Sequence, residues 1–103
     1  MIVSIEHINQ VNNIQSIVSQ VTGVKMIDIG LNSRKAQIVQ ARHLSMYFCR
    51  FNTRINTLEI SKMHGKDNHA TVLHACNCIH QDRKTNKQLN EMFEQIQSQL
   101  KNS

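Results

Sequence analysis

The chain has 103 residues, the length of one ordinary domain, and its 40% hydrophobic content is mostly aliphatic because aromatic residues make up only 4%. A formal net charge of +5 favours an acidic partner, such as nucleic acid or an anionic membrane surface. The same charge argues against a protein that mimics an acidic surface. No stretch approaches the roughly 18 consecutive apolar residues of a membrane span, which excludes a membrane-embedded helix. Three cysteines without a secretory signal favour a reducing interior, so we expect a cytoplasmic, nucleoid-associated protein.

The first half of the chain predicts helices separated by short connectors. Apolar residues recur every three or four positions from about His7 to Thr22, where Gly23 marks the end of the first helix. The segment VKMIDIG is long enough for one helical turn, and the polar segment LNSRKAQ is expected to connect it to a second long helix. That helix, from about Ala36 to Asn52, is apolar nearly all round, which is typical of a central helix. Its expected core stripe consists of Ala41, Leu44, Phe48 and Phe51.

The second half predicts a short helix, a glycine turn and two longer helices. The short helix runs from about Thr57 to Met63, with Asn56 or Thr57 as its cap, and Gly65 ends it. Asp67 or Asn68 caps the next helix, which ends near Gln81, and the last helix starts near Asn86. Strand patterns are lacking in the sequence. The fold class is therefore all-α, one domain over residues 1–103 with about five to six helices, and proline-free throughout.

Positive charge is concentrated in the middle of the chain. Between residues 29 and 66 there are seven lysines and arginines and a single acid, Glu59, whereas the remainder is close to neutral. Within the same half, a short helix, a tight turn and a helix that opens with Asn68, His69 and Thr71 form the pattern of a helix-turn-helix. In that motif the N-terminal side chains of the second helix meet base edges in the major groove. The pattern predicts DNA binding, although simple helix capping would use the same residue types.

Several separated segments strengthen this interpretation. GKDNHATVLHAC resembles GGRDHTTVLHAC, a signature of the C-terminal DNA-binding domain (domain IV) of the bacterial replication initiator DnaA, in the Trp-repressor-like helix-turn-helix superfamily. SRKAQIVQARHLSMYFCR resembles the family's basic loop and following helix, KRKREIVLARQIAMYLSR, and TLEISKMHG resembles SLPEIGRAFG. IQSIVSQVTGVKMIDI is similar to the first helix and its short successor.

The resemblance implies a partner, a site and residue roles. It implies that a monomer binds double-stranded DNA at an asymmetric box of the TTATNCACA type, with Arg34 in the minor groove. The phosphate contacts that it implies fall on Lys35, Arg42, His43, Arg50 and Lys66. The implied major-groove positions are Leu58, Asn68, His69, Ala70, Thr71 and His74.

Four positions depart from the family pattern. Asn68 replaces an aspartate and Ala70 a threonine, and each changed base contact is worth roughly 1–3 kcal/mol of discrimination. His43 replaces a glutamine, and His64 replaces a phenylalanine that helps to pack the short helix. In an alternative register, Asp67 is the family's aspartate and Asn68 is an inserted residue.

The sequence carries no phosphate-binding loop of the form G-x-x-x-x-G-K-[ST], so we expect no nucleotide binding within this chain. The chain is then either a piece of a longer initiator or a stand-alone protein. Its role is either replication initiation or regulation, the latter through competition for boxes or repression at a promoter. A stand-alone transcription regulator, or a protein-interaction module of the same fold, remains the alternative.

Other kinds of site are weaker interpretations. HACNCIH contains the zinc-type ligands His74, Cys76, Cys78 and His80, but in a helix only residues four apart share a face, and the two such pairs point in different directions. A nucleophilic cysteine would need a basic pocket, which the spacing does not build. We therefore expect no metal, no cofactor and no enzymatic activity.

Overall fold

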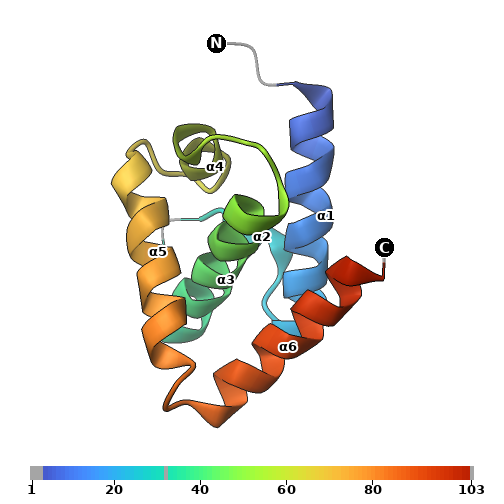
Figure 1. Ribbon diagram of the computed structural model, residues 1–103. Helices are drawn as coiled ribbons and strands as arrows, with labels where there is room; N and C mark the ends of the chain where they lie inside the picture. The colour runs from blue at the N-terminus through green and yellow to red at the C-terminus, as the bar shows by residue number, and fades with distance from the viewer. Residues whose placement is uncertain (1–3, 32, 103) are drawn as a thin grey trace.

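The computed structural model of the protein describes residues 4–31 and 33–102, and six α-helices account for most of them. No strand occurs in these two ranges, so the predicted all-α class is confirmed. In Figure 1, α3 runs through the middle of the molecule between α1 and α5, while α4 lies at the end of α5 and α6 crosses below. The helices are α1 (Ile5–Thr22), α2 (Met26–Ile29), α3 (Ala36–Asn52), α4 (Thr57–Met63), α5 (His69–Asp82) and α6 (Lys87–Lys101).

Short polar side chains and glycines set the helix boundaries. Ser4 accepts hydrogen bonds from the backbone N–H groups of Glu6 and His7, which starts α1 two residues before the predicted position. Gly23 ends α1 in the left-handed conformation, at φ 79°, as expected. The predicted bounds of α3 and α4 are confirmed, and Asn56 is the cap of α4.

The core is aliphatic and centred on α3. Leu44, Met46 and Cys49 are fully buried, and Phe48 is 1% exposed, so most sides of α3 contact neighbours. The prediction for Phe51 was wrong. This ring is 58% exposed because it lies in the last turn of α3, beyond the end of the core, where it packs on the edge of Tyr47. Every other helix contributes buried residues to the same cluster, including Val18, Ile29, Ile60, Val72 and Ile96.

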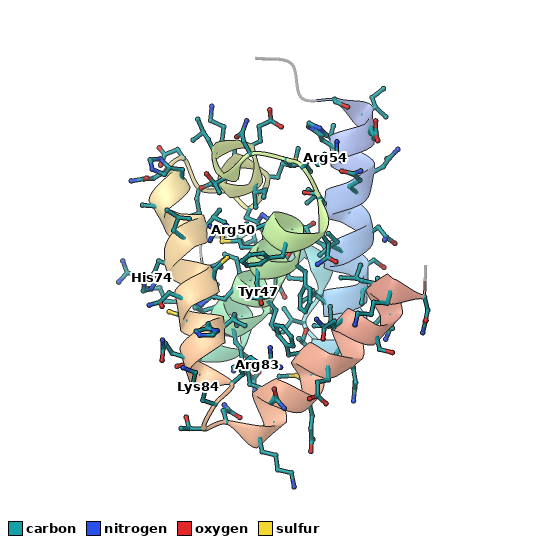
Figure 2. The ribbon with its side chains drawn as sticks, in the orientation of Figure 1. Tyr47, Arg50, Arg54, His74, Arg83 and Lys84 are labelled. Atoms are coloured by element: carbon teal, nitrogen blue, oxygen red, sulfur yellow. The ribbon has the colours of Figure 1, made fainter. Side chains whose placement is uncertain are left out.

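The contact between α3 and α6 contains an aromatic cluster. The ring of Phe93 lies 4.8 Å from that of Phe48 and 5.1 Å from that of Tyr47, between ring centroids. The guanidinium of Arg83 lies 3.5 Å above the Phe93 ring centroid, and its Nε donates to Oδ1 of Asn90. Arg83 is half-buried there, because the aromatic ring attracts its cation. Figure 2 labels Tyr47 and Arg83 on this side of the molecule.

Within residues 4–31 and 33–102, none of the helices combines the length and the hydropathy that a membrane span requires.

Candidate nucleic-acid interface

The helix-turn-helix is built by α4, a five-residue bend (residues 64–68) and α5. Asn56 caps α4 by accepting from the backbone N–H of Glu59 at 2.9 Å. Gly65 takes φ 78°, a conformation that other residues adopt rarely, and this reverses the chain within the bend. Asn68 then caps α5, with Oδ1 accepting from the backbone N–H of Ala70 at 2.9 Å. The prediction that one of two neighbours caps this helix is thereby resolved in favour of Asn68.

Buried polar contacts hold the two helices of the motif in place. Ser61 on α4 donates from its hydroxyl to the backbone carbonyl of Asn68 at 2.9 Å, which ties α4 to the first residue before α5. His64 is fully buried at the end of α4, with Nδ1 2.7 Å from the carbonyl oxygen of Ile60 and Nε2 2.6 Å from Oγ of Ser45. Nδ1 must donate to the carbonyl, so Nε2 accepts from the serine hydroxyl. The structure thus places His64 in the core, at the position where the resembled pattern has a phenylalanine.

Burial has a marked electrostatic effect on His64. Desolvation lowers the pKa of this imidazole from 6.5 to about 4, although its hydrogen bond to the carbonyl of Ile60 acts in the opposite direction. The ring is therefore neutral at physiological pH, which matches the acceptor role of Nε2. A neutral histidine in this position makes two directed hydrogen bonds that the phenylalanine of the resembled pattern does not make.

The start of α5 presents polar side chains to solvent. Asn68, His69 and Ala70 are exposed and Thr71 is half-buried, and none of these faces the core that Val72 enters. One turn further on, His74 is exposed as well, and Figure 2 shows it on α5, far from α6. Five of the six residues that the resemblance assigned to the major groove therefore lie at the N-cap and in the first two turns of α5. Leu58, the remaining member of that set, is half-buried at the start of α4.

A histidine pair joins α3 to α5 beside this surface. The rings of His43 and His74 are perpendicular with centroids 5.9 Å apart, and Nε2 of His74 lies 3.4 Å from Sγ of Cys78. Burial lowers the pKa of His43, and the charges of His74 and Arg42 lower it further, while Asp82 opposes them. His43 is thus a neutral, half-buried neighbour of the exposed His74 at neutral pH.

The basic segment before α3 is held by a buried arginine. Arg34 and Lys35 are exposed, and the backbone N–H of Lys35 donates to Oγ of Ser33. Arg42 was expected to contact phosphate at the surface, but it is only 4% exposed. Its guanidinium donates to three backbone carbonyls, those of Ile29, Leu31 and Ser33. Arg50 lies eight residues further along α3 and, unlike Arg42, is exposed.

The remaining cations are more accessible. The Arg50 guanidinium lies 5.1 Å from the Phe51 ring centroid, and Figure 2 labels it near the end of α3. Lys62 is exposed and Lys66 half-buried, both close in sequence to the bend of the motif. These three cations belong to the basic part of the chain that the sequence count indicated, whereas α6 exposes the acids Glu91 and Glu94.

The zinc-type residues of α5 do not form a site. In the part of the chain that the structure describes, no three histidine, cysteine or acidic side chains converge in a way that would hold a metal ion. Cys76 is 5% exposed on the core side of α5, where burial raises the pKa of its thiol.

Comparison with known protein families identifies the family of this helix-turn-helix. The model of the family described as the bacterial dnaA protein helix-turn-helix matches residues 11–79, which include α4, the bend and most of α5. The chain belongs to this family. The match also covers the basic segment and all of α3, so the dnaA-type helix-turn-helix here includes the elements that the resemblance had singled out.

The chain is also similar to curated bacterial proteins that are named as replication initiators. The chromosomal replication initiator protein DnaA of Borrelia garinii subsp. bavariensis is 34% identical over 98 residues, which are 93% of this chain and 20% of that protein. Its counterpart in Borreliella burgdorferi is 34% identical over 95 residues, covering 90% of this chain and 20% of the relative. The Bacteroides thetaiotaomicron protein of the same name is 38% identical over 73 residues, 71% of this chain and 16% of its own length. The chain therefore spans about a fifth of the length of the first relatives.

Sequence reasoning missed two features of this interface. Leu73 is 40% exposed on α5, between the polar positions Thr71 and His74. Its position between Thr71 and His74, two implied contact positions, could have indicated that Leu73 belongs to the interface. The second is a close approach of Gly65 to Gly30: a Cβ added to Gly65 would lie 2.5 Å from the carbonyl oxygen of Gly30. No sequence pattern reveals that contact, because the two glycines belong to different elements.

Proposed function

We propose that this chain binds double-stranded DNA in a sequence-specific manner, with the start of α5 in the major groove and Arg34 in the adjacent minor groove. The exposed, capped front of α5 in a dnaA-type helix-turn-helix is the observation that carries the proposal. Helix N-termini carry partial positive charge and free N–H groups, which attract phosphates, while the polar side chains there reach base edges. The curated relatives are named as replication initiators, and we propose initiation, or its regulation, as the role of this chain too.

The contacts divide by chemistry. His69, Thr71 and His74 offer donors and acceptors to bases, while Leu58, Ala70 and Leu73 offer apolar contact, for example to thymine methyl groups. Lys35, His43, Arg50 and Lys66 supply phosphate contacts, and the ring of His43 also packs edge-on against that of His74. Arg34 fits a narrow, A·T-rich minor groove, where negative potential is enhanced. We propose that one domain binds one asymmetric site as a monomer, in the nucleoid and so in the cytoplasm.

The departure at Asn68 predicts a change in base preference. Oδ1 is engaged by the N–H of Ala70, so the group left for a base is the amide NH₂, a donor. An aspartate in the same place would cap with one oxygen and offer the other as an acceptor, which suits the amine of cytosine. Asn68 instead suits an acceptor such as N7 of a purine or O4 of thymine. We therefore expect the preferred DNA site of this chain to resemble TTATNCACA and to differ from it at the base pair that Asn68 contacts.

Fluorescence anisotropy tests the proposal with a duplex carrying one TTATNCACA box and a scrambled duplex of equal composition, each at two salt concentrations. We expect preference for the box or a close variant, and affinity that falls as salt rises. Equal, salt-sensitive binding to both would leave DNA binding without box specificity, to be followed by random-site selection. Lack of binding to either at low salt would refute the proposal and favour a protein-interaction module of this fold.

Variants separate the roles. His69→Ala and His74→Ala should reduce discrimination more than affinity for the scrambled duplex, whereas Arg50→Ala should weaken both duplexes about equally. Lys101→Ala, on α6, is the matched control for loss of a cation away from the interface. If all of these variants behave alike, the assignment of roles is wrong.

A further inference from the structure

We propose that Arg42 is a positioning residue for the minor-groove contact: its buried guanidinium holds the backbone immediately before Arg34 and so sets the place of Arg34. The inference rests on the proposed function of Arg34. In this proposal Arg42 does not make the phosphate contact that the resemblance implies for it. The A·T preference attributed to Arg34 then depends on a side chain that does not touch DNA.

The hydrogen bonds of Arg42 all lead to one segment. Nε donates to the carbonyl of Ile29 at 3.1 Å, and Nη2 donates to the carbonyls of Leu31 and Ser33, the latter at 3.1 Å. Ile29 ends α2 and is fully buried, while Ser33 immediately precedes Arg34. A single side chain from the second turn of α3 thus connects the fixed end of α2 with the residue before the proposed DNA contact. Backbone carbonyls that have no partner in a helix or sheet thereby obtain one.

The chemistry suits arginine alone. Its guanidinium is planar and rigid and presents several N–H donors in fixed directions, so one group can bind three carbonyls at once. A lysine has a compact ammonium on a flexible stem and cannot reproduce that geometry. Burial lowers the pKa of the Arg42 guanidinium from its ordinary value, because a buried site disfavours the charged form, and the three carbonyl dipoles offset part of this cost. A side chain needed only for phosphate attraction would have no reason to be desolvated in the absence of DNA.

The bend of the helix-turn-helix also contacts the segment that Arg42 holds. Gly65, in the bend of the helix-turn-helix, approaches the carbonyl oxygen of Gly30 so closely that a Cβ would lie 2.5 Å from it. Gly30 lies between two residues whose carbonyls Arg42 binds. The start of the basic loop is therefore clamped between α3 and the bend that leads into α5. This connection places the major-groove and minor-groove elements in a fixed relation before DNA arrives, which reduces the ordering cost of binding.

The first test uses the DNA-free protein. Arg42→Lys keeps the charge and loses the fork, so we expect faster hydrogen exchange at the amides of Leu31 and Lys35, with α5 amides unchanged. Arg50→Lys, an exposed arginine eight residues along the same helix, is the matched control and should leave both loop amides as they are. If Arg42→Lys unfolds the domain, Arg42→Met, which keeps the aliphatic volume, replaces it. Unchanged exchange at both loop amides in a folded variant would overturn the clamp, whatever the DNA results.

The second test is a double-mutant cycle on DNA with Arg42→Lys and Arg34→Ala. If Arg42 acts through Arg34, Arg42→Lys lowers affinity for the box by about tenfold when Arg34 is present and has little further effect when Arg34 is alanine. Replacing the A·T pairs under the loop with G·C should likewise remove the effect of Arg42→Lys. Additive losses together with a salt slope reduced by about one in an Arg42→Met variant would identify a phosphate contact and overturn the proposal. Should Arg34→Ala itself leave the A·T preference intact, the proposed minor-groove contact fails, while the hydrogen-exchange result still decides whether Arg42 clamps the loop.

Discussion

Two sides of this small domain are held together by different forces. On the side of α6, the aromatic rings of Phe93, Phe48 and Tyr47 pack against one another, and Arg83 covers that of Phe93. On the side of α4 and α5, buried hydrogen bonds join the elements, with His64 to Ser45 as the central pair. Apolar packing is strong but tolerates small shifts, whereas hydrogen bonds fix directions. The polar side is the one that presents the proposed DNA contacts, so stability and precise placement are supplied by different halves of the molecule.

Phe93→Ala should produce the largest change. Truncation of a fully packed phenylalanine typically costs about 3–5 kcal/mol, and it would also remove the ring beneath Arg83. Urea unfolding followed by circular dichroism measures the loss, with the exposed Gln95→Ala on the same helix as control. The folded fraction should bind DNA as the wild type does, since α6 takes no part in the proposed contacts. Selective loss of box discrimination in folded Phe93→Ala would show that the two sides are not separable.

Acid should act on the polar side through His64. Its pKa is about 4 in the folded protein and 6.5 in the unfolded chain, so unfolding takes up a proton between these values. Stability is therefore fully present above pH 6.5 and falls as the pH drops towards 4, by about 2 kcal/mol between pH 7 and pH 5. The double variant Ser45→Ala with His64→Phe, which leaves no unpaired hydroxyl, should lack this component. Urea unfolding at the two pH values measures it, and equal losses in both proteins would mean that His64 does not titrate as its burial requires.

The exposed cap of α5 should have a smaller effect on stability and a distinct effect on recognition. Asn68→Ala removes the hydrogen bond to the N–H of Ala70 and should cost about 1 kcal/mol. Asn68→Asp keeps a cap and should retain stability, but it replaces a donor towards DNA with an acceptor. Random-site selection with both proteins should then differ at one base pair, in favour of cytosine for the aspartate variant. Identical selected sites would place Asn68 outside the base-reading set.

The sequence predicted the helices well and the buried polar contacts poorly, for a physical reason. Helix bounds follow local signals, namely apolar periodicity, the caps Asn56 and Asn68 and the glycine ends, and all of these operate within a few residues. The family pattern then located the exposed front of α5. Arg42 shows what local signals do not predict. Its spacing of eight residues from Arg50 indicates that both lie on the same side of α3. The carbonyls that Arg42 binds, however, lie outside α3, and their direction depends on the completed fold. Phe51 fails similarly, because helical periodicity does not say where the core ends.

The smallest effect is expected where a surface pair joins α1 to α4, at the margin of the polar side. Nδ1 of His7 on α1 lies 2.9 Å from Oε2 of Glu59 on α4, with the two side chains 34% and 13% exposed. Pairs as accessible as this contribute about 0–1 kcal/mol, because solvent screens them and both side chains lose freedom. A double-mutant cycle of His7→Ala and Glu59→Gln, measured by urea unfolding at low and high salt, should therefore give a coupling below about 1 kcal/mol that salt weakens. A larger, salt-independent coupling would mean that α4 is positioned from α1 as well as from Ser45, and the polar side of the molecule would then extend further than the buried bonds indicate.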